Sequence, residues 1–372
     1  MSAAYAGRIR AFDWLRGLSV PFMIQCHALV LLSPGLPDSD AGLMLRWLDG
    51  LVAPSFLLAA GFALALLQVR AARSAREGDG SVAFRRAKTL RRIGGVLGVA
   101  TLVNWMWFPI FREPRWIARV DILHCVGLSL LIVFAVVAPL ASRPRALIVT
   151  SALVATAFFF VAPFGEAVTG PWAMLVNKST GAVFPLLPWT GYVFLGAVFG
   201  TIAATARDVY ALPRALALMM GVTVPLWLLT PVLRDAFPPH AFATFNPAEH
   251  AKRLTVVAVI LLGLLHIEHR MPRLSRAPPI WILDVFGTSS MSAYFFHEAL
   301  LFYRLNGFSF EAVWGHRAGW AAYAGLTALL VALTFGLSWL TDRLYRRVSP
   351  LLDEALRRLL ASGERSAVAP GA

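Results

Sequence analysis

Three histidines lie in or beside long apolar segments, where an imidazole could exchange a proton during a reaction. His27 lies in the first of these segments, His124 begins the fourth, and His297 lies in the ninth. An ionisable residue inside a membrane-spanning helix costs about 2.5–3.5 kcal/mol to insert, so each one needs a reason. With an ordinary pKa of about 6.5, imidazole suits general base catalysis of a group transfer at neutral pH. The alternative for each histidine is a structural role, bonded to a neighbouring backbone carbonyl.

The first apolar segment carries three ionisable residues along one face. At about 100° per residue, Asp13, Arg16 and His27 fall within an arc of about 60°. Asp13 and Arg16 are three residues apart and can form an ion pair, whereas His27 lies about 21 Å further along the helix than Asp13. We expect this face to point into the protein interior or a cavity, and the pair Asp13–Arg16 to fix the helix end.

A metal is the other chemistry that these residue types could serve. The adjacent pairs Cys26–His27 and His124–Cys125 contain zinc-type ligands. Neighbouring side chains on a helix diverge by about 100°, however, so neither pair would chelate one ion comfortably. The remaining ligands would have to come from separate segments, and we therefore expect no metal site.

The segments that must position these residues are long and apolar. Of the 372 residues, 58% are hydrophobic and 15% are charged, against about 45–50% and about 25% in soluble proteins. A helix needs about 20 residues to cross the hydrocarbon core of a bilayer. We predict an all-α, polytopic integral membrane protein with about ten transmembrane helices, at residues 12–32, 48–69, 93–111, 121–141, 146–164, 184–205, 212–232, 253–269, 279–304 and 319–341.

Basic residues in the loops predict the orientation. If the N-terminus is cytoplasmic, the inner loops and tails hold 23 Lys and Arg residues and the outer loops hold ten, as the positive-inside rule requires. Both termini are then cytoplasmic, with a transmembrane unit at 1–341 and an amphipathic or disordered tail at 342–372 along the inner surface. The net charge of +14 does not indicate nucleic acid, because no recognition module lies between the apolar segments.

The same orientation places all three histidines towards the outer side of the membrane. Asp121 lies one turn before His124 and Tyr294 lies one turn before His297, a spacing at which one side chain can orient another. The loop charges alone thus predict that the three histidines lie on one side of the membrane. This shared position is the strongest sign of a functional site in the residue pattern.

Five segments resemble, in the same order along the chain, conserved stretches of the transmembrane acyltransferases. They are RIRAFDWLRGLSVPFMIQCHA (8–28), APSFLLAAGFALAL (53–66), DILHCVGLSLL (121–131), FPLLPWTGYVFLGAVFG (184–200) and FGTSSMSAYFFHEALL (286–301). The nearest resemblance is to the heparan-alpha-glucosaminide N-acetyltransferase catalytic-domain family and its bacterial members. The opening segment is also similar to that of acyltransferase-three type enzymes.

The resemblance implies a bacterial inner-membrane enzyme that takes an acyl group, usually acetyl, from cytoplasmic acyl-CoA. The acceptor would be a sugar or glycan amine or hydroxyl at the outer face. Arg16 and Gly17 match the opening motif, and His27 falls where the family places a catalytic polar residue. His297 matches the late histidine, and Trp189 belongs to the sixth-span motif. Animal members instead carry Asn at the position of His27 and a histidine in the first outer loop, where residues 33–47 here contain none.

We therefore expect His27 to be the general base or, as the alternative, an acyl-carrying nucleophile. His297 or Tyr294 would orient the acceptor or donate a hydrogen bond to the oxyanion. Asp121 and His124 would line the acceptor site, and Trp189 would offer a flat face to a sugar ring. The phosphates of coenzyme A would bind to basic residues at the inner side, of which the candidates are Arg16, Arg85, Arg86, Lys88, Arg91 and Arg92, although these are also the expected anchor to anionic lipid headgroups.

The rival function is transport. A flippase or transporter for a lipid-linked sugar or small solute would use intramembrane His, Asp and Arg residues as a proton relay or substrate path. The absence of an inverted sequence repeat and the ordered acyltransferase-like segments favour the enzyme. A third reading is a structural membrane subunit without a ligand. The expected partners are the bilayer and a sugar or glycan acceptor, with a homodimer as an open alternative and no nucleic acid.

Overall fold

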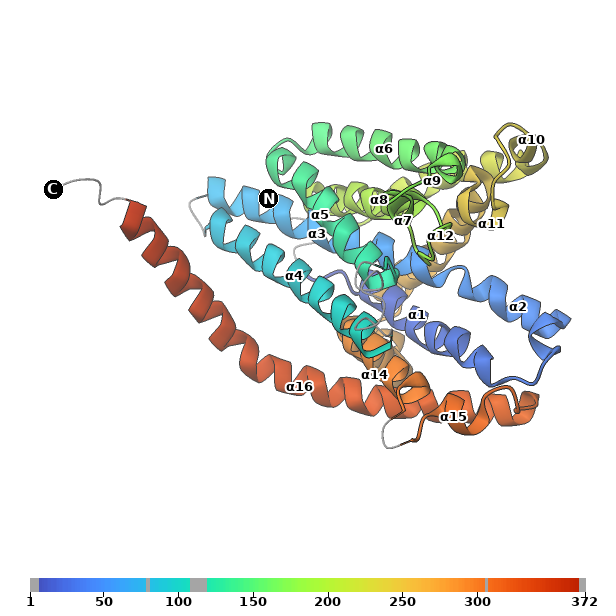
Figure 1. Cartoon of the computed structure of the whole chain (residues 1–372). Coiled ribbons are helices and arrows are strands. Elements are labelled where there is room, and N and C mark those ends of the chain that lie inside the picture. The colour runs from blue at the N-terminus through green and yellow to red at the C-terminus, as the bar shows by residue number, and fades with distance from the viewer. Residues whose placement is uncertain (1–6, 78–80, 108–118, 305–306, 368–372) are drawn as a thin grey trace.

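The computed structural model of this chain is all-α and describes residues 7–77, 81–107, 119–304 and 307–367. Figure 1 shows long helices packed side by side in a bundle. Eight of the described helical segments are long and apolar enough to cross a membrane, which confirms a polytopic membrane bundle. They are Arg10–Leu31, Asp40–Arg76, Ile122–Leu140, Pro144–Ala167, Leu186–Thr205, Ala211–Leu228, Pro247–Arg270 and Trp320–Leu359.

The other two predicted spans take different forms. The predicted span 93–111 corresponds to α4 (Val82–Trp107), a helix whose first part is basic, and its last four predicted residues lie outside the described part of the chain. The predicted span 279–304 is two helices, α13 (Pro278–Thr288) and α14 (Ser290–Phe302), separated by Ser289.

Two hydroxyl hydrogen bonds lie at the break between α13 and α14. The Ser289 hydroxyl donates to the Val285 carbonyl at 2.5 Å, and the Thr288 hydroxyl donates to the Asp284 carbonyl at 2.9 Å. Such side chains compete with the helical hydrogen-bond pattern, and at Ser289 the backbone leaves helical geometry with φ −110° and ψ 24°. The chain therefore turns just before the residues of α14 that build the site.

Glycines allow α1 (Arg10–Ala28) to pack directly on the backbone of α13. A Cβ atom at Gly17 would lie 2.0 Å from the Leu283 carbonyl oxygen, and one at Gly287 would lie 2.0 Å from the Asp13 carbonyl oxygen. Real Cβ atoms essentially never come within 3.0 Å of another heavy atom in this way. The two helices can therefore adopt this spacing only with glycine at both positions, as in other close helix contacts in membranes.

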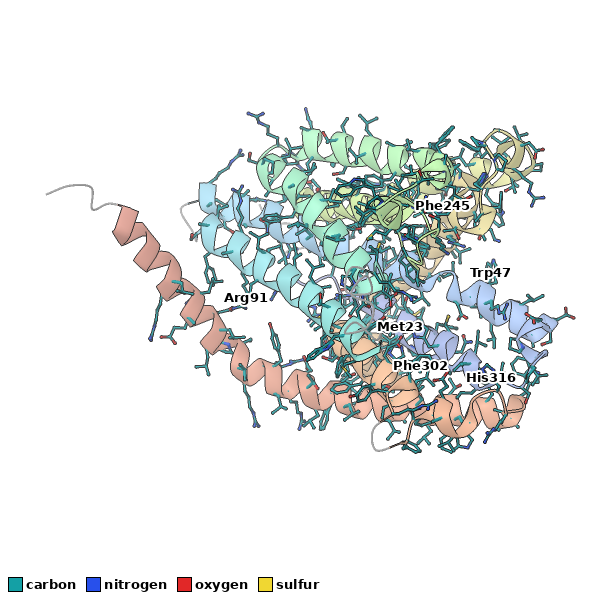
Figure 2. All side chains as sticks on the ribbon, in the orientation of Figure 1. Met23, Trp47, Arg91, Phe245, Phe302 and His316 are labelled. Carbon is teal, nitrogen blue, oxygen red and sulfur yellow. The ribbon has the colours of Figure 1, made fainter. Side chains whose placement is uncertain are left out.

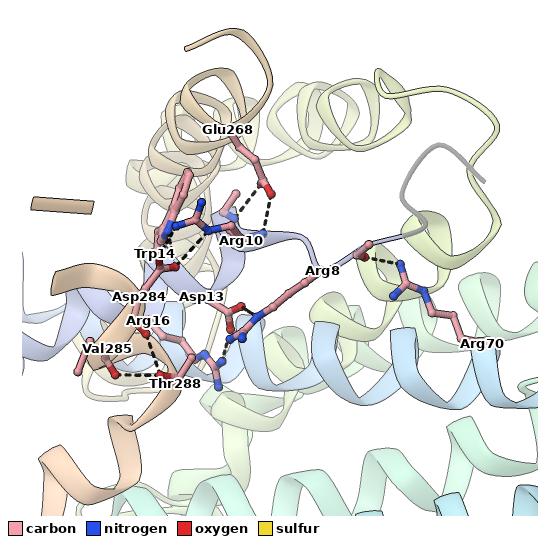
Figure 3. Close-up of polar contacts among 12 residues, drawn as sticks. Arg8, Arg10, Asp13, Trp14, Arg16, Arg70, Glu268, Asp284, Val285 and Thr288 are labelled. Carbon is pink, nitrogen blue, oxygen red and sulfur yellow. Dashed lines mark hydrogen bonds and ion pairs between the residues drawn. The ribbon is translucent and has the colours of Figure 1, made fainter. Parts of the chain in front are cut away.

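Polar groups fix the N-terminal end of α1 to two later helices, as Figure 3 shows. The Glu268 carboxylate on α12 (Pro247–Arg270) accepts hydrogen bonds from the backbone N–H groups of Arg10 at 2.7 Å and Ala11 at 2.9 Å. It thereby satisfies two donors that a helix N-terminus leaves unpaired. On α13, Asp284 accepts from the Trp14 indole at 2.8 Å and pairs with the Arg10 guanidinium.

The predicted ion pair between Asp13 and Arg16 is present and includes a third residue. Arg16 pairs with one carboxylate oxygen of Asp13, and Arg8 pairs with the other at 2.5 Å. Asp13 itself is buried. The hydrogen bond to Asp13 raises the pKa of Arg8, so Arg8 stays charged.

The last helix, α16 (Trp320–Ala367), runs through residue 341 without a break, although 341 is where the sequence predicts the end of the transmembrane unit. In Figure 1 its distal half extends away from the bundle and passes the N-terminal end of α4. There Asp353 pairs with Lys88 and, at 2.8 Å, with Arg91, and Arg357 lies 5.0 Å above the Phe84 ring. The placement of this segment along a lipid surface stays a prediction.

Candidate active site

The structure brings residues from the two ends of the sequence together where α1 meets α14. His27 Nδ1 lies 2.5 Å from the Oε1 atom of Glu298 and 2.8 Å from the Nε2 atom of His297. His297 Nε2 lies 3.3 Å from the same Glu298 oxygen. The labels of Met23 and Phe302 in Figure 2 mark this part of the bundle. His27 and His297, which the sequence predicts on the same side of the membrane, lie at hydrogen-bonding distance.

The three side chains differ in exposure. His297 is fully buried and Glu298 is 5% exposed, whereas a third of the His27 side chain stays accessible. The imidazole rings of His27 and His297 stack at 5.1 Å, and the Phe302 ring lies 6.4 Å from His27. His27 is therefore the most accessible of the three, while its two partners are enclosed by protein.

Hydrogen-bond partners determine where the protons lie. His297 Nδ1 is 2.8 Å from the Ala293 carbonyl oxygen, which can only accept, so Nδ1 of His297 carries the hydrogen. In a neutral ring, His297 Nε2 is then an acceptor. His27 Nδ1 faces this acceptor and the Glu298 carboxylate, so it must carry a hydrogen too. The Nε2 atom of a neutral His27 is left with a free lone pair.

Tyr294 lies beside His297, with ring centres 5.5 Å apart, and it connects this cluster to Asp121. The Tyr294 hydroxyl donates to Asp121 Oδ2 at 3.4 Å, and Asp121 Oδ1 accepts from the Ile122 backbone N–H at 2.7 Å. Asp121 is thus the N-cap of α5 (Ile122–Leu140). His124, also on α5, is half-buried, and its Nδ1 atom is buried without a hydrogen-bond partner among the described residues.

Trp189 belongs to a different cluster. It is only 5% exposed and packs at ring distances of 5.9 Å from Tyr192, 5.9 Å from His250 and 5.2 Å from Phe184. The Tyr192 hydroxyl donates to His250 Nδ1 at 2.7 Å, because His250 Nε2 donates to the Thr244 carbonyl at 2.9 Å. These contacts brace α8 (Leu186–Thr205) against α12. A ring buried in this way offers no open face to a sugar, so the platform role predicted for Trp189 has no support in this arrangement.

The predicted phosphate-binding residues divide into paired and exposed ones. Lys88 and Arg91 pair with Asp353, Arg86 donates to the Ala138 carbonyl at 2.6 Å, and Arg16 pairs with Asp13. Arg85 and Arg92 are exposed on the same end of α4. Arg85 and Arg92 therefore remain open to an anion, whereas Lys88 and Arg91 already neutralise a carboxylate.

Two acidic residues near His27 were absent from the sequence-based list. Glu298 follows His297 directly, and both side chains reach the same nitrogen of a third residue, His27 Nδ1, on another helix. Asp49, at the end of α2 (Asp40–Asp49), has two buried carboxylate oxygens, and its one hydrogen-bond partner in the described part of the protein is the Cys26 thiol, a weak donor. It interacts electrostatically with His27 and Cys26.

A metal ion is also compatible with these ligand types. The ligand atoms of His27, His297 and Glu298 all lie within 4.8 Å of one another, and they form the one such group found among the described residues. The distances of 2.5 Å and 2.8 Å from His27 Nδ1 are, however, those of hydrogen bonds. The arrangement as it stands holds a proton between the helices.

Comparison with known families agrees with the sequence resemblance. The family model described as "Heparan-alpha-glucosaminide N-acetyltransferase, catalytic" matches residues 8–228. No curated protein matches the chain. The matched region holds His27, Asp49 and Asp121, and it ends before α14, which carries His297 and Glu298. Since it covers more than half of the 372 residues, this multi-span membrane protein belongs to the heparan-alpha-glucosaminide N-acetyltransferase catalytic family, a family of acetyltransferases.

Proposed function

We propose that this protein transfers an acetyl group from cytoplasmic acetyl-CoA to an amine or hydroxyl of a sugar or glycan at the outer face of a membrane, with His27 as the general base. The observation that carries the proposal is the contact of His27 with Glu298 and His297 across α1 and α14. Family membership supports acetyl-CoA as the donor. The acceptor, the orientation and the residue roles are our inference.

The proton positions support the role of His27. With Nδ1–H directed at Glu298, the lone pair of Nε2 is available to take the acceptor's proton as its amine or hydroxyl attacks the thioester carbonyl. The Glu298 carboxylate stabilises the imidazolium that forms, as the carboxylate of a catalytic triad does. The C–S bond of the thioester then breaks, and coenzyme A leaves as a thiol after taking the proton from the imidazolium. The His297 hydrogen bond to the Ala293 carbonyl keeps His297 from taking this proton at Nδ1. His297 and Glu298 thus position His27.

The course of helix α4 supports a donor that binds at the basic end of this helix and extends to His27. Its N-terminal end carries Arg85, Arg91 and Arg92, and its C-terminal part reaches the site, where Val103 lines a small cavity together with Glu298. From Arg91 to Val103 the helix rises by about 18 Å. Donor phosphates bound at the basic end would leave the acyl end of the molecule near His27. The cavity measures about 10 Å³, room for about one water molecule, so the helices must separate when the donor binds.

Asp49 supports a polar or cationic acceptor. A buried carboxylate whose hydrogen-bond donor is only a weak thiol is costly, because most of its desolvation is uncompensated. An acceptor ammonium or hydroxyl group beside His27 would supply a stronger partner. The Tyr294 hydroxyl is bonded to Asp121 and is therefore placed to hold the outer end of α5 rather than to face the substrate.

The test is transfer of labelled acetyl from acetyl-CoA to a panel of amino sugars and glycans by the purified protein. We expect His27→Ala to abolish transfer while acetyl-CoA still raises the melting temperature in detergent. His266→Ala, which removes an exposed histidine of α12, is the matched control and should leave transfer unchanged. Wild-type turnover in His27→Ala would refute the assignment, and solute movement without acetylation in the wild type would favour the transporter.

A further inference from the structure

We propose that the atoms His27 Nδ1, His297 Nε2 and Glu298 Oε1 form a binding site for a divalent transition metal such as Zn²⁺, and that the bound metal inhibits acetyl transfer. The inhibition rests on the proposed function, whereas the binding does not. The three atoms lie within 4.8 Å of one another. Two histidines and one glutamate are a ligand set that zinc accepts, with a further position for water.

Two features of the surroundings fit a metal ligand set. His297 donates its other ring hydrogen to the Ala293 carbonyl, which directs the Nε2 lone pair towards the centre of the group. Metal-binding histidines almost always have such a partner. Glu298 brings a negative charge that is 5% exposed, and burial makes that charge attract a cation more strongly than it would in water. No metal site was expected because its ligands would have to come from separate segments, and α1 and α14 bring such ligands together.

The distances show what binding would require. Bonds of about 2.0–2.1 Å at tetrahedral angles separate the ligand atoms by about 3.3 Å. His297 Nε2 and Glu298 Oε1 are already 3.3 Å apart, so these two ligands are correctly spaced. His27 Nδ1 is 2.8 Å and 2.5 Å from them and must retreat by less than about 1 Å. A third of its side chain is accessible, so the ring has room to move.

Metal binding changes the protonation of His27. In the metal-free state the hydrogen is on Nδ1 and the lone pair is on Nε2. When Zn²⁺ takes Nδ1, the hydrogen of the neutral ring moves through solvent to Nε2, with no net gain or loss of protons. If the ring is an imidazolium, one proton leaves to the solvent. In both cases Nε2 then carries a hydrogen and can no longer act as a base, so the metal removes the function of His27 without touching the substrate.

The experiment titrates the purified, full-length protein with ZnCl₂ or MgCl₂ and measures both the melting temperature and acetyl transfer. We expect Zn²⁺ to raise the melting temperature and to stop transfer, EDTA to reverse both effects, and Mg²⁺, which prefers oxygen ligands, to do neither. His297→Ala and the isosteric Glu298→Gln should weaken zinc binding by at least about tenfold. His266→Ala should leave it unchanged.

Two outcomes would overturn the proposal: no zinc-dependent shift in the wild type, or the same zinc affinity in His297→Ala and Glu298→Gln. Glu298→Gln keeps the shape of the side chain, so it guards against a variant that fails to fold. Because the shift is measured without substrate, zinc binding to a protein that transfers no acetyl group would refute the proposed function and leave the metal site standing.

Discussion

Replacing Gly17 by alanine should disable the site from a distance of several helical turns. A Cβ atom at this position would lie 2.0 Å from the Leu283 carbonyl oxygen, a backbone atom of α13 that cannot rotate away. To reach even 3.0 Å, the two helices must separate by about 1 Å, since shorter contacts are essentially never seen. Only Ser289 separates α13 from α14, so α14 should follow the movement.

The same displacement decides the effect on function. Moving α14 by about 1 Å would lengthen the contact between His27 and Glu298 from 2.5 Å to the limit of a hydrogen bond. A misplacement of this size costs about a hundredfold in rate when it affects a catalytic group. Overpacking of a buried contact costs about 1–3 kcal/mol in stability. We therefore expect Gly17→Ala to lower kcat for acetyl transfer by about two orders of magnitude and to lower the melting temperature.

The assay is acetyl transfer and thermal unfolding of the purified variants in one detergent. Gly94→Ala on α4 is the matched control, because a Cβ atom there meets nothing within 4 Å and alanine is the better helix former. It should be neutral or slightly stabilising. A Gly17→Ala protein with wild-type kcat and melting temperature would show that the close contact of α1 and α13 does not position the site.

Four further substitutions test the remaining contacts. Glu298→Gln should lower kcat by about 10²–10⁴-fold without loss of acetyl-CoA binding, because the amide can donate to His27 Nδ1 and favour the wrong tautomer; an unchanged kcat would exclude a positioning role. Glu268→Ala should cost about 1–2 kcal/mol of stability in chemical unfolding, since two backbone donors of α1 lose their acceptor; no loss would mean that water replaces it. Asp353→Ala should free its two basic partners on α4 and lower KM for acetyl-CoA about two- to fivefold, and an unchanged KM would place the donor phosphates elsewhere. Asp49→Asn should raise KM for an amine acceptor more than KM for the donor, as steady-state kinetics with each substrate varied would show; equal effects on both would contradict its contact with the acceptor.

The composition predicts the membrane bundle well because apolar length is a local property of the chain. The pair Asp13–Arg16 is also a local feature, three residues apart on one helix, and it is present. The loop charges predict that His27 and His297 lie towards the same side of the membrane, but not that their side chains are in contact. Which face of each helix meets which neighbour depends on packing, and the sequence pattern contains little of that information.

The errors of prediction have the same origin. The predicted span 279–304 is apolar enough to be interpreted as one helix. The change of backbone geometry at Ser289, and the hydroxyl bonds of Thr288 and Ser289 beside it, form only in the folded chain and cannot be predicted from apolar length. Trp189 looked like an open ring at a helix end, but its exposure depends on Tyr192 and His250, which come from other parts of the fold. Spacing within one helix could not predict Glu298, because its partner lies 271 residues earlier on α1.

The proposed function needs more of the chain than the region that matches the family. Residues 8–228 contain His27 but none of α12, α13 and α14. Without them His27 would lose both hydrogen-bond partners of Nδ1, and nothing would select the tautomer that leaves Nε2 free. The N-terminus of α1 would lose its cap from Glu268, and Gly17 would have no helix to pack against. Under the proposed function, the C-terminal helices thus belong to the catalytic machinery, because they determine the chemical state of a histidine that the N-terminal region carries.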